Sequence, residues 1–451
     1  MARLVILGGG GFRVPLVYEA TIDPSDTRLV DEVVLYDIDA DRLAVIERVI
    51  ASMAERPGAP AFRVTDDLDR ALAGADFVFS AIRVGGAAGR TVDERVALGL
   101  GLLGQETIGP GGLAYALRTI GPMRRIAEAI ARHAPDAWVI NFTNPAGIVT
   151  EVMRTVLGDR VVGICDTPIG LVRRVARVLG HSLTDPDVDY DYLGLNHLGW
   201  LRSFSIDGQD RLPALLADDR LLLQIEEARI LGPLWVRAQG VLPNEYLYYY
   251  LHTDSARDRI LAAPRTRGEQ LVAQQGEFYR AARGTGTPAA DLWRDALAER
   301  ESTYMAESRD EERDPADIAG GGYQEVALRF MAAVSGASGP ERMILDVGNE
   351  SAGSTLVPSL PGDLVVEVPC LVDAGGVNPR AVGAPDPSQL GLMAQLRGSE
   401  RLIARAALTG SRDLAWQGFA LHPLVTSIDL GRRLLEGYLA AEPGLAAILH
   451  R

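Results

Sequence analysis

The sequence predicts an α/β fold: a doubly wound parallel sheet, followed by a second, mixed α+β domain. Over the first 165 residues, short apolar runs alternate with longer helical patterns, which is typical of parallel strands joined by crossover helices. From residue 166 onward the alternation is lost, and strand-like runs follow one another directly. A chain of 451 residues is also too long for one ordinary core. We therefore expect two domains, residues 1–165 and residues 166–451.

Composition and charge narrow the class of protein. The chain is 47% hydrophobic and 23% charged, as soluble globular proteins are, and its net charge of -15 argues against a nucleic-acid partner. No uncharged apolar run approaches the roughly 18 residues of a membrane helix, so no membrane partner is expected. The first predicted strand, residues 4–7, leaves no room for a signal peptide, and two distant cysteines make no disulfide framework. We expect a cytoplasmic enzyme.

The first strand runs into a glycine-rich turn and then a helical pattern, in the segment RLVILGGGGFRVPLVYEA. The turn consists of Gly8, Gly9, Gly10, Gly11 and Phe12. Glycines let a backbone approach a pyrophosphate closely, and the N-terminus of the following helix favours its negative charge. The spacing departs from G-x-G-x-x-G, so a plain tight turn is an equally good interpretation of the motif alone.

The second strand, in EVVLYDID, ends beside Asp37. An acidic side chain at this place in a dinucleotide-binding domain bonds the adenosine ribose hydroxyls. A helix-capping role for Asp37 is the alternative. The position of the acid after the second strand strengthens the prediction of a dinucleotide site.

Further strands are predicted in ADFVFSAI, AWVINFTNP and RVVGIC, with helices such as ALRTIGPMRRIAEAIARHA between them. The pattern predicts a Rossmann-like sheet, whose ligand binds at the carboxyl ends of the strands. Arg83, Asn141, Asn144 and Cys165 all fall at or just beyond those ends. Four polar or reactive side chains at one edge indicate a site.

The second half is predicted to begin with a strand pair, DYDYLGLNHLGW and LRSFSIDG, followed by helices from residue 212. Two later runs, RMILDVGNE and DLVVEVPCLVDAGG, are expected to form a second, mixed sheet, in which Cys370 packs as a buried residue. A long helix is predicted over residues 388–410.

Five motifs occur in order along the chain: RVGGAAGRTVDERVALGLGLLGQETIGPGGLAYALRTIGP, INFTNPAGIVTE, VVGICDTPIG, YLGLNHLGW and PNEYLYYY. Together they resemble the NAD- and manganese-dependent glycosidases of glycoside hydrolase family 4, and most closely the 6-phospho-β-glucosidases. The resemblance covers nearly the whole chain, with its strongest motifs between residues 82 and 250.

The resemblance implies two cofactors. NAD+ would bind the glycine turn, Asp37 and Arg83, and a divalent metal, Mn2+ or another transition metal, would bind Cys165 and His197. A thiolate with an imidazole suits a borderline or softer metal better than magnesium. From the residues alone, a structural histidine would be the default interpretation of His197, although it stands in a short polar break after YDYLGL.

The implied reaction is redox-assisted elimination. NAD+ oxidises C3 of the sugar, a base removes the C2 proton, the aglycone leaves C1, and water adds before C3 is reduced again. The resemblance assigns the base to Tyr246, while Tyr248 to Tyr250 are expected to pack. Asp166 is the candidate acid for the leaving oxygen; family members differ between aspartate and asparagine here, so it leaves the anomeric preference and the identity of the acid open.

Arg90, Asn144 and Arg267 match family positions that bind substrate, and Glu106 is expected to reach the metal shell or a sugar hydroxyl. Arginine suits a sugar phosphate because its fork bonds two oxygens at once. A helix-start carboxylate is the alternative for Glu106. The implied substrate is a phosphorylated disaccharide or glucoside.

The glycine turn departs from many relatives, whose loop carries serine and threonine hydroxyls that hold the phosphate. Gly11 and Val14 stand at those places, and Arg13 either compensates with a charge or indicates a different acidic group on the substrate. By resemblance the chain is a homodimer or homotetramer. The alternatives are a relative acting on α-glucosides, α-galactosides or glucuronides, an NAD-dependent 2-hydroxy-acid dehydrogenase, and a cofactor-binding protein without catalysis.

Overall fold

The computed structural model describes residues 2–23, 28–284, 286–302, 305–308, 322–351 and 353–450. Six parallel strands form its N-terminal part: β1 (Arg3–Leu7), β2 (Glu32–Tyr36), β3 (Ala61–Thr65), β4 (Phe77–Ser80), β5 (Trp138–Asn141) and β6 (Val161–Gly163). They lie in the order β3-β2-β1-β4-β5-β6, so the winding reverses between β1 and β4. This confirms the predicted doubly wound sheet. Ligands bind at such a reversal, beyond the carboxyl ends of the strands.

Apolar side chains explain why these short runs become central strands. Leu4 to Leu7 and Val33 to Leu35 are fully buried, because helices cover both faces of the sheet. The connecting helices are α1 (Val14–Ala20), α2 (Ala40–Ala54), α3 (Leu68–Leu72), α4 (Gly86–Gly99), α5 (Pro110–His133), α6 (Ala146–Leu157) and α7 (Thr167–Val178).

The sheet does not stop at β6. Antiparallel strands extend it in the order β11 (Glu341–Gly348), β14 (Val365–Asp373), β7 (Val188–Leu195), β8 (Leu198–Ile206) and β10 (Leu242–Pro243), with β15 (Gly376–Pro379) and β9 (Gln209–Asp210) at its margins. The expectation of a separate second sheet is therefore wrong. Strand β11 pairs with β6 at Asp346 and Gly163, where the missing side chain of Gly163 makes room for the Asp346 carboxyl group.

The predicted strand pair exists, but its turn lies inside the first predicted segment. Strands β7 and β8 are joined at Asn196 and His197, and His197 has a left-handed φ of 62°. Gly194 and Gly199 allow the two strands to approach closely, because a Cβ on Gly194 would lie 2.6 Å from the Gly199 Cα.

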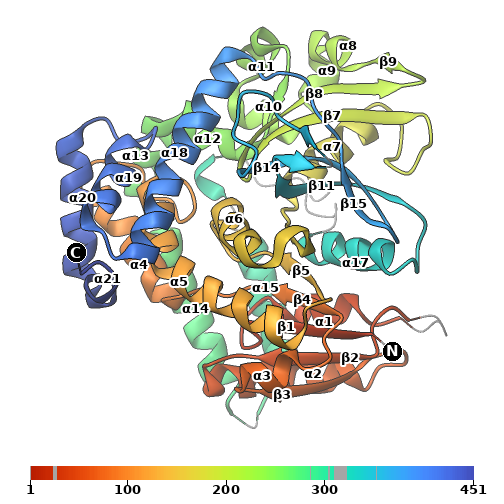
Figure 1. The fold of residues 1–451 in the computed structure, drawn as a ribbon, viewed down its shortest axis with the longest axis vertical. Coiled ribbons are helices and arrows are strands. Elements are labelled where there is room, and N and C mark those ends of the chain that lie inside the picture. The colour runs from red at the N-terminus through yellow and green to blue at the C-terminus, as the bar shows by residue number, and fades with distance from the viewer. Residues whose placement is uncertain are drawn as a thin grey trace.

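The remaining helices surround the extended sheet (Figure 1). They are α8 (Leu212–Ala217), α9 (Asp219–Leu222), α10 (Glu226–Leu231), α11 (Pro233–Gln239), α12 (Tyr248–Leu251), α13 (Thr253–Ala262), α14 (Arg267–Ala281), α15 (Ala289–Ser302), α17 (Tyr323–Val334), α18 (Pro387–Thr409), α19 (Arg412–Leu421), α20 (Ile428–Ala441) and α21 (Pro443–Ile448). The C-terminal helices return to the N-terminal half. There Arg118 of α5 binds Asp93 at 2.7 Å and Glu442 at 2.8 Å. The division into two domains at residue 165 stays a prediction.

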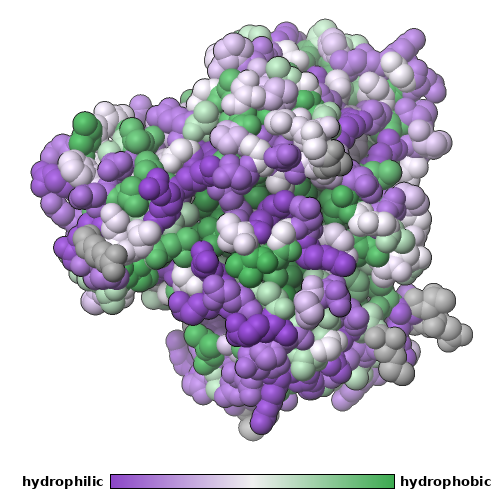
Figure 2. Space-filling model, viewed as in Figure 1, coloured by the Kyte–Doolittle hydropathy of each residue, from purple (hydrophilic) through white to green (hydrophobic). Residues whose placement is uncertain are grey.

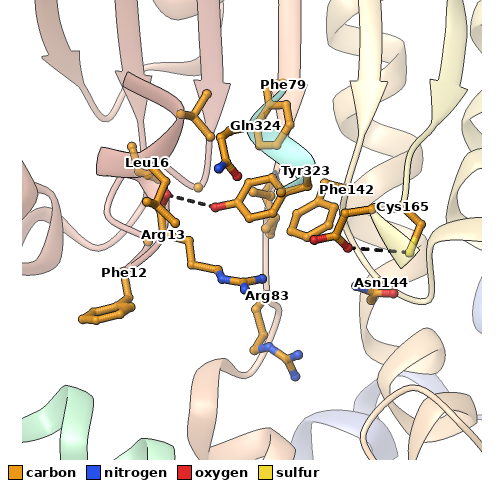
Figure 3. Close-up of a pocket in the computed structure, with 18 of the residues that line it drawn as sticks. Phe12, Arg13, Leu16, Phe79, Arg83, Phe142, Asn144, Cys165, Tyr323 and Gln324 are labelled. Carbon is orange, nitrogen blue, oxygen red and sulfur yellow. Dashed lines mark hydrogen bonds between the residues drawn. The ribbon is translucent and has the colours of Figure 1, made fainter. Parts of the chain in front are cut away.

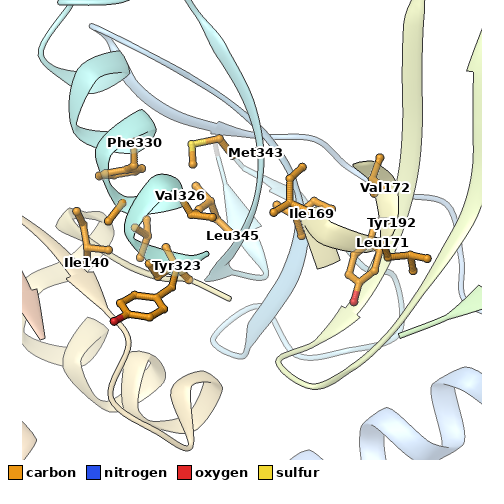
Figure 4. Close-up of a cluster of buried hydrophobic side chains, with 14 of the residues drawn as sticks. Ile140, Ile169, Leu171, Val172, Tyr192, Tyr323, Val326, Phe330, Met343 and Leu345 are labelled. Carbon is orange, nitrogen blue, oxygen red and sulfur yellow. The ribbon is translucent and has the colours of Figure 1, made fainter. Parts of the chain in front are cut away.

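Buried apolar side chains join the two halves. One cluster runs from Ile140 of β5 through Phe330 of α17 and Leu345 of β11 to Ile169 and Tyr192 (Figure 4). The outer surface is different: in the view of Figure 2, hydrophilic side chains cover most of the face, and hydrophobic ones show in smaller patches between them. Across the described ranges, no helix has the length and apolar character needed to cross a bilayer.

Candidate active site

A cavity of about 1540 Å³ opens where β1, β4, β5 and β6 end and where β7 turns into β8. Figure 3 shows part of its wall, with Phe12 and Arg13 on one side and Asn144 and Cys165 on the other. Most of the predicted site residues line this cavity: Gly8, Gly10, Gly11, Phe12, Asp37, Arg83, Arg90, Glu106, Asn144, Cys165, Asp166, His197 and Tyr246. Gly9 and Arg267 are not among the lining residues.

The glycine loop is packed too closely for side chains. A Cβ on Gly9 would lie 2.8 Å from the Leu35 Cβ, and a Cβ on Gly10 would lie 3.0 Å from Asp37 Oδ2. Gly9 therefore serves the packing of the turn on β2, where its N–H donates to the Tyr36 carbonyl oxygen at 2.7 Å.

The Asp37 carboxylate is held at the mouth of the loop. It accepts hydrogen bonds from the N–H groups of Gly10 at 2.8 Å and Asp39 at 3.0 Å. The cap of α2 is Asp39, which accepts from Arg42 N–H, so the capping interpretation of Asp37 is wrong. Asp37 instead lines the cavity.

Cys165 and Tyr246 are connected through the polar side chains of Thr167 and Asn244. Cys165 Sγ lies 3.4 Å from Thr167 Oγ1, which accepts a hydrogen bond from Asn244 Nδ2 at 2.9 Å. Asn244 Oδ1 in turn accepts from the N–H of Tyr246 at 3.1 Å. The Tyr246 ring stacks on His197, with 3.9 Å between the ring centroids and 19° between the planes. These hydrogen bonds and the ring stacking therefore link the start of α7, the segment Asn244–Tyr246 and the β7–β8 turn to one another.

Burial sets the protonation of the two predicted metal ligands. Burial lowers the pKa of His197 to about 4, although Glu106 opposes this, so the imidazole is neutral at pH 7 and able to ligate. Burial, with Asp166 and Glu367 nearby, raises the pKa of the Cys165 thiol well above its ordinary value. Only a bound cation would favour its thiolate.

Glu106 joins two arginines at the cavity wall. Its carboxylate pairs with Arg83 and, at 2.7 Å, with Arg90 Nη1. Burial alone would raise the pKa of Glu106, but Arg83, Arg90 and Arg300 outweigh it and hold the pKa at about 2. Arg90 is further fixed by Glu94 at 2.8 Å. The helix-start interpretation of Glu106 gives way to an ion-pair bridge that orients both guanidinium groups.

Asn144 presents an unused acceptor. Its Oδ1 is buried and accepts no hydrogen bond from any residue that the structure describes. Buried polar atoms are normally paired, so this oxygen is suited to a sugar hydroxyl or a cation in the cavity. Asp166 lines the same space, with its Oδ1 4.0 Å from Cys165 Sγ.

Arg300, which the sequence did not single out, completes the wall beside Arg13. Arg300 of α15 and Arg13 both line the cavity, and Glu301 lies 3.4 Å from Arg13 and 3.7 Å from Arg300. Arg267 donates to the Arg300 carbonyl oxygen at 2.9 Å and so stands behind this group. Burial, Arg13 and Arg267 together lower the pKa of Arg300 to about 9. Arg300 sits in an ordinary charged helix, so no motif could have revealed it.

Comparison with known proteins gives the family. Residues 3–181 match the model of the family 4 glycosyl hydrolases, and residues 192–425 match that of the family 4 glycosyl hydrolase C-terminal domain. A probable 6-phospho-beta-glucosidase of Bacillus subtilis is 31% identical over 97% of this chain and 96% of its own. A maltose-6'-phosphate glucosidase of the same organism is 30% identical over 97% and 95%.

Solved structures agree with this. The 6-phospho-beta glucosidase of Thermotoga maritima, determined with NAD and glucose-6-phosphate, superimposes with a TM-score of 0.82 at 26% identity, covering 98% of this chain and 99% of its own. A 6-phospho-alpha-glucosidase from gut microorganisms, in complex with NAD and Mn2+, gives 0.80 at 27% identity, covering 98% of both chains. On the strength of both family models and the full-length relatives, the chain belongs to glycosyl hydrolase family 4.

Proposed function

We propose that the chain is an NAD+- and divalent-metal-dependent glycosidase that hydrolyses 6-phospho-β-glucosides. The observation that carries this is that one cavity contains the glycine loop, Cys165, His197 and the arginines Arg13, Arg90 and Arg300. The Thermotoga maritima relative, with NAD and glucose-6-phosphate, supports the same combination of ligands. A 2-hydroxy-acid dehydrogenase is not favoured, because both family models are those of glycosyl hydrolases.

The residues present fit both cofactors. The glycine loop has no side chain between its backbone and the cavity at Gly10 and Gly11, and the Asp37 carboxylate stands where the ribose hydroxyls of NAD+ would donate. Cys165 and His197 supply one sulfur and one neutral nitrogen ligand, which suits Mn2+ or another transition metal, and Asn144 Oδ1 is available close by on the same wall.

When bound, NAD+ and the metal supply reversible oxidation at C3 of the sugar and polarisation of its oxygen atoms. The chain's own groups then move the protons. Tyr246 would accept the C2 proton as its phenolate, once the charge of the nearby cation has favoured loss of the phenolic proton to solvent. Its ring is stacked on His197 and its backbone N–H is bonded to Asn244. Asp166 lies beside Cys165 and is the candidate acid, which would take a proton from solvent and pass it to the leaving oxygen at C1.

The phosphate group is proposed to bind between Arg13, Arg90 and Arg300, with Arg267 behind them. Buried cations in mutual proximity are unfavourable unless an anion joins them. Burial followed by Arg90 lowers the pKa of Arg267, and burial followed by Arg13 and Arg267 lowers the pKa of Arg300. Repulsion among the arginines therefore remains, although Glu106 and Glu301 lie beside them. A phosphate dianion would relieve it through several charge-assisted hydrogen bonds.

The test is release of p-nitrophenol from its β-glucoside 6-phosphate, with NAD+, Mn2+ and a reducing thiol present. We expect turnover that needs both cofactors and leaves no net NADH. Parallel assays use the unphosphorylated glucoside and the α-linked 6-phosphate. Equal rates without phosphate would remove the arginine assignment, and a faster α-linked substrate would reverse the anomeric preference. Steady accumulation of NADH with a 2-hydroxy acid would contradict the proposal altogether.

We also propose that the enzyme acts in the cytoplasm as a homodimer or homotetramer. The free thiol of Cys165, which the metal site requires, is maintained in a reducing compartment. Light scattering coupled to size-exclusion chromatography measures the subunit number, and a monomer under assay conditions would contradict it.

A further inference from the structure

Three backbone carbonyl oxygens between Gly10 and Arg13, at the end of the glycine loop, accept hydrogen bonds from side chains far along the chain. Tyr279 Oη donates to Gly10 O at 2.7 Å, Trp293 Nε1 to Phe12 O at 2.8 Å and Tyr323 Oη to Arg13 O at 3.1 Å. These donors come from α14, α15 and α17 in turn. Figure 3 shows the last contact, with the Tyr323 hydroxyl directed at the backbone of Arg13.

We infer that Tyr279, Trp293 and Tyr323 form a clamp that positions the glycine loop for the pyrophosphate of the dinucleotide. The inference rests on the proposed binding of NAD+. The three residues are positioning residues, because they act on the cofactor only through the loop.

The donors are themselves firmly held. The side chains of Tyr279, Trp293 and Tyr323 are 8%, 1% and 2% exposed. Tyr323 stacks on Phe142 with 4.2 Å between ring centroids, and the Arg42 guanidinium lies 4.2 Å over the Tyr279 ring. A buried donor that is held in place by its neighbours also fixes the position of its acceptor, so these contacts restrict the loop to one backbone conformation.

The segment that joins α14 to α15, close to Tyr279, is also attached to the first half of the chain. Arg283, just after α14, pairs with Asp41 at 2.9 Å, and Arg48 of α2 donates to the Gly284 carbonyl oxygen at 2.7 Å. The Phe278 and Phe12 rings pack in a T-shaped arrangement, with 5.4 Å between the ring centroids. Helices α14 and α15 therefore lie on the dinucleotide-binding half although they belong to the second half of the sequence (Figure 1).

Peptide geometry explains how hydrogen bonds to these carbonyl groups fix the shape of the whole glycine loop. The C=O and N–H of a trans peptide point in opposite directions, so fixing the carbonyls of Gly10, Phe12 and Arg13 also fixes the N–H groups that follow them. Two of these close the turn: Gly11 N–H donates to Gly8 O at 2.8 Å, and Val14 N–H donates to Gly11 O at 3.0 Å. A peptide group that loses its hydrogen bond to a clamp side chain could rotate its carbonyl oxygen toward the pyrophosphate. The partial negative charge of that oxygen would oppose binding.

Tyr279→Phe tests the clamp, and Tyr18→Phe is its matched control. Each removes one buried hydroxyl that donates to a carbonyl oxygen at 2.7 Å, but Tyr18 bonds Pro60 O, away from the loop. Both variants should lose a similar part of their thermal stability, because each leaves one buried carbonyl unpaired. Titration calorimetry should show NAD+ and ADP-ribose binding roughly fivefold to tenfold more weakly to Tyr279→Phe only, with adenosine binding unchanged.

The outcomes distinguish failure of the clamp from failure of the proposed function. If wild type binds NAD+ and Tyr279→Phe binds it equally well, the clamp is wrong and the proposed function stands. If wild type binds no NAD+, the proposed function fails and the clamp fails with it. An equal loss of adenosine affinity would show a general structural effect and would also overturn the clamp. Tyr323→Phe, which removes the bond to Arg13 O, serves as a second variant if the first does not fold.

Discussion

Replacing Arg300 by methionine should stabilise the protein without ligand and abolish its response to a sugar phosphate. Arg300 lies in the cavity wall with Arg13 and Arg90, and Arg267 donates to its carbonyl oxygen from behind. Glu301 is its acidic neighbour, with 3.7 Å between Arg300 Nε and Glu301 Oε1. Methionine keeps an unbranched apolar chain of similar reach and removes the charge. A residue selected for binding an anion, and not for stability, should behave in this way.

The pKa of Arg300 gives the magnitude. Burial first, then Arg13 and Arg267, lower it from 12.5 to about 9. At about 1.4 kcal/mol for each pK unit, holding the charge in the folded state costs at most about 5 kcal/mol at pH 7. The lost contacts of the guanidinium group offset part of this, so we expect a net stabilisation of roughly 1–3 kcal/mol.

The assay is urea unfolding at pH 7, with and without glucose 6-phosphate at about 100 times its Kd for wild type. Wild type should gain about 2.7 kcal/mol from the ligand, and Arg300→Met should gain almost nothing. Arg294→Met is the matched control, since Arg294 lies on the same helix, pairs with Asp291 and is 57% exposed. A variant that is less stable than wild type and still gains the full ligand effect would refute the reasoning.

Three further predictions concern other groups. Cys165→Ser should bind Mn2+ at least tenfold more weakly in electron paramagnetic resonance titrations while its NAD+ affinity stays within twofold, and unchanged Mn2+ binding would remove Cys165 from the metal site. Tyr246→Phe should lower kcat by a factor of about 100 or more with little change in NAD+ affinity, and a kcat within threefold of wild type would assign the base elsewhere. Burial lowers the pKa of His422 to about 3, so the unfolded chain takes up a proton first, and stability is lost as pH falls from 6.5 toward 3. Between pH 7 and pH 5 this amounts to about 2 kcal/mol. His422→Asn keeps an acceptor for the Leu424 N–H, which His422 Nδ1 now binds at 3.1 Å, and it should unfold in urea with a pH dependence smaller by that amount; an unchanged pH dependence would exclude His422 as its cause.

Local sequence patterns were sufficient to predict the strands that lie inside the parallel part of the sheet. Strands β1, β2, β4, β5 and β6 are short apolar runs, and each was expected because a strand buried on both faces needs only continuous hydrophobicity. Strand β3, Ala61–Thr65, was missed. It lies at the edge, none of its residues is fully buried, and its sequence AFRVT carries little apolar signal.

The same distinction holds for the site. Its reactive residues stand next to strand ends or within quoted motifs, so Cys165, His197 and Tyr246 could be named before their surroundings were known. Their placement in one cavity supports these assignments, although their individual roles stay predictions. The residues proposed as the clamp had no such marker, because the acceptors of Tyr279 and Trp293 lie more than 200 residues away in the chain. Arg300 had none because Arg13, which shares Glu301 with it, is equally distant.

The order of apolar runs, glycines and motifs along the chain was enough to predict a doubly wound sheet, a dinucleotide-type loop and the family resemblance. These are properties of short segments, whose burial and turn geometry depend on neighbouring residues. The joining of β11 to β6 into one continuous sheet, the return of α14 and α15 onto the glycine loop and the gathering of arginines around Arg300 depend on long-range packing. No local pattern encodes such contacts, since their free energy arises only when distant segments bury surface and pair polar groups together.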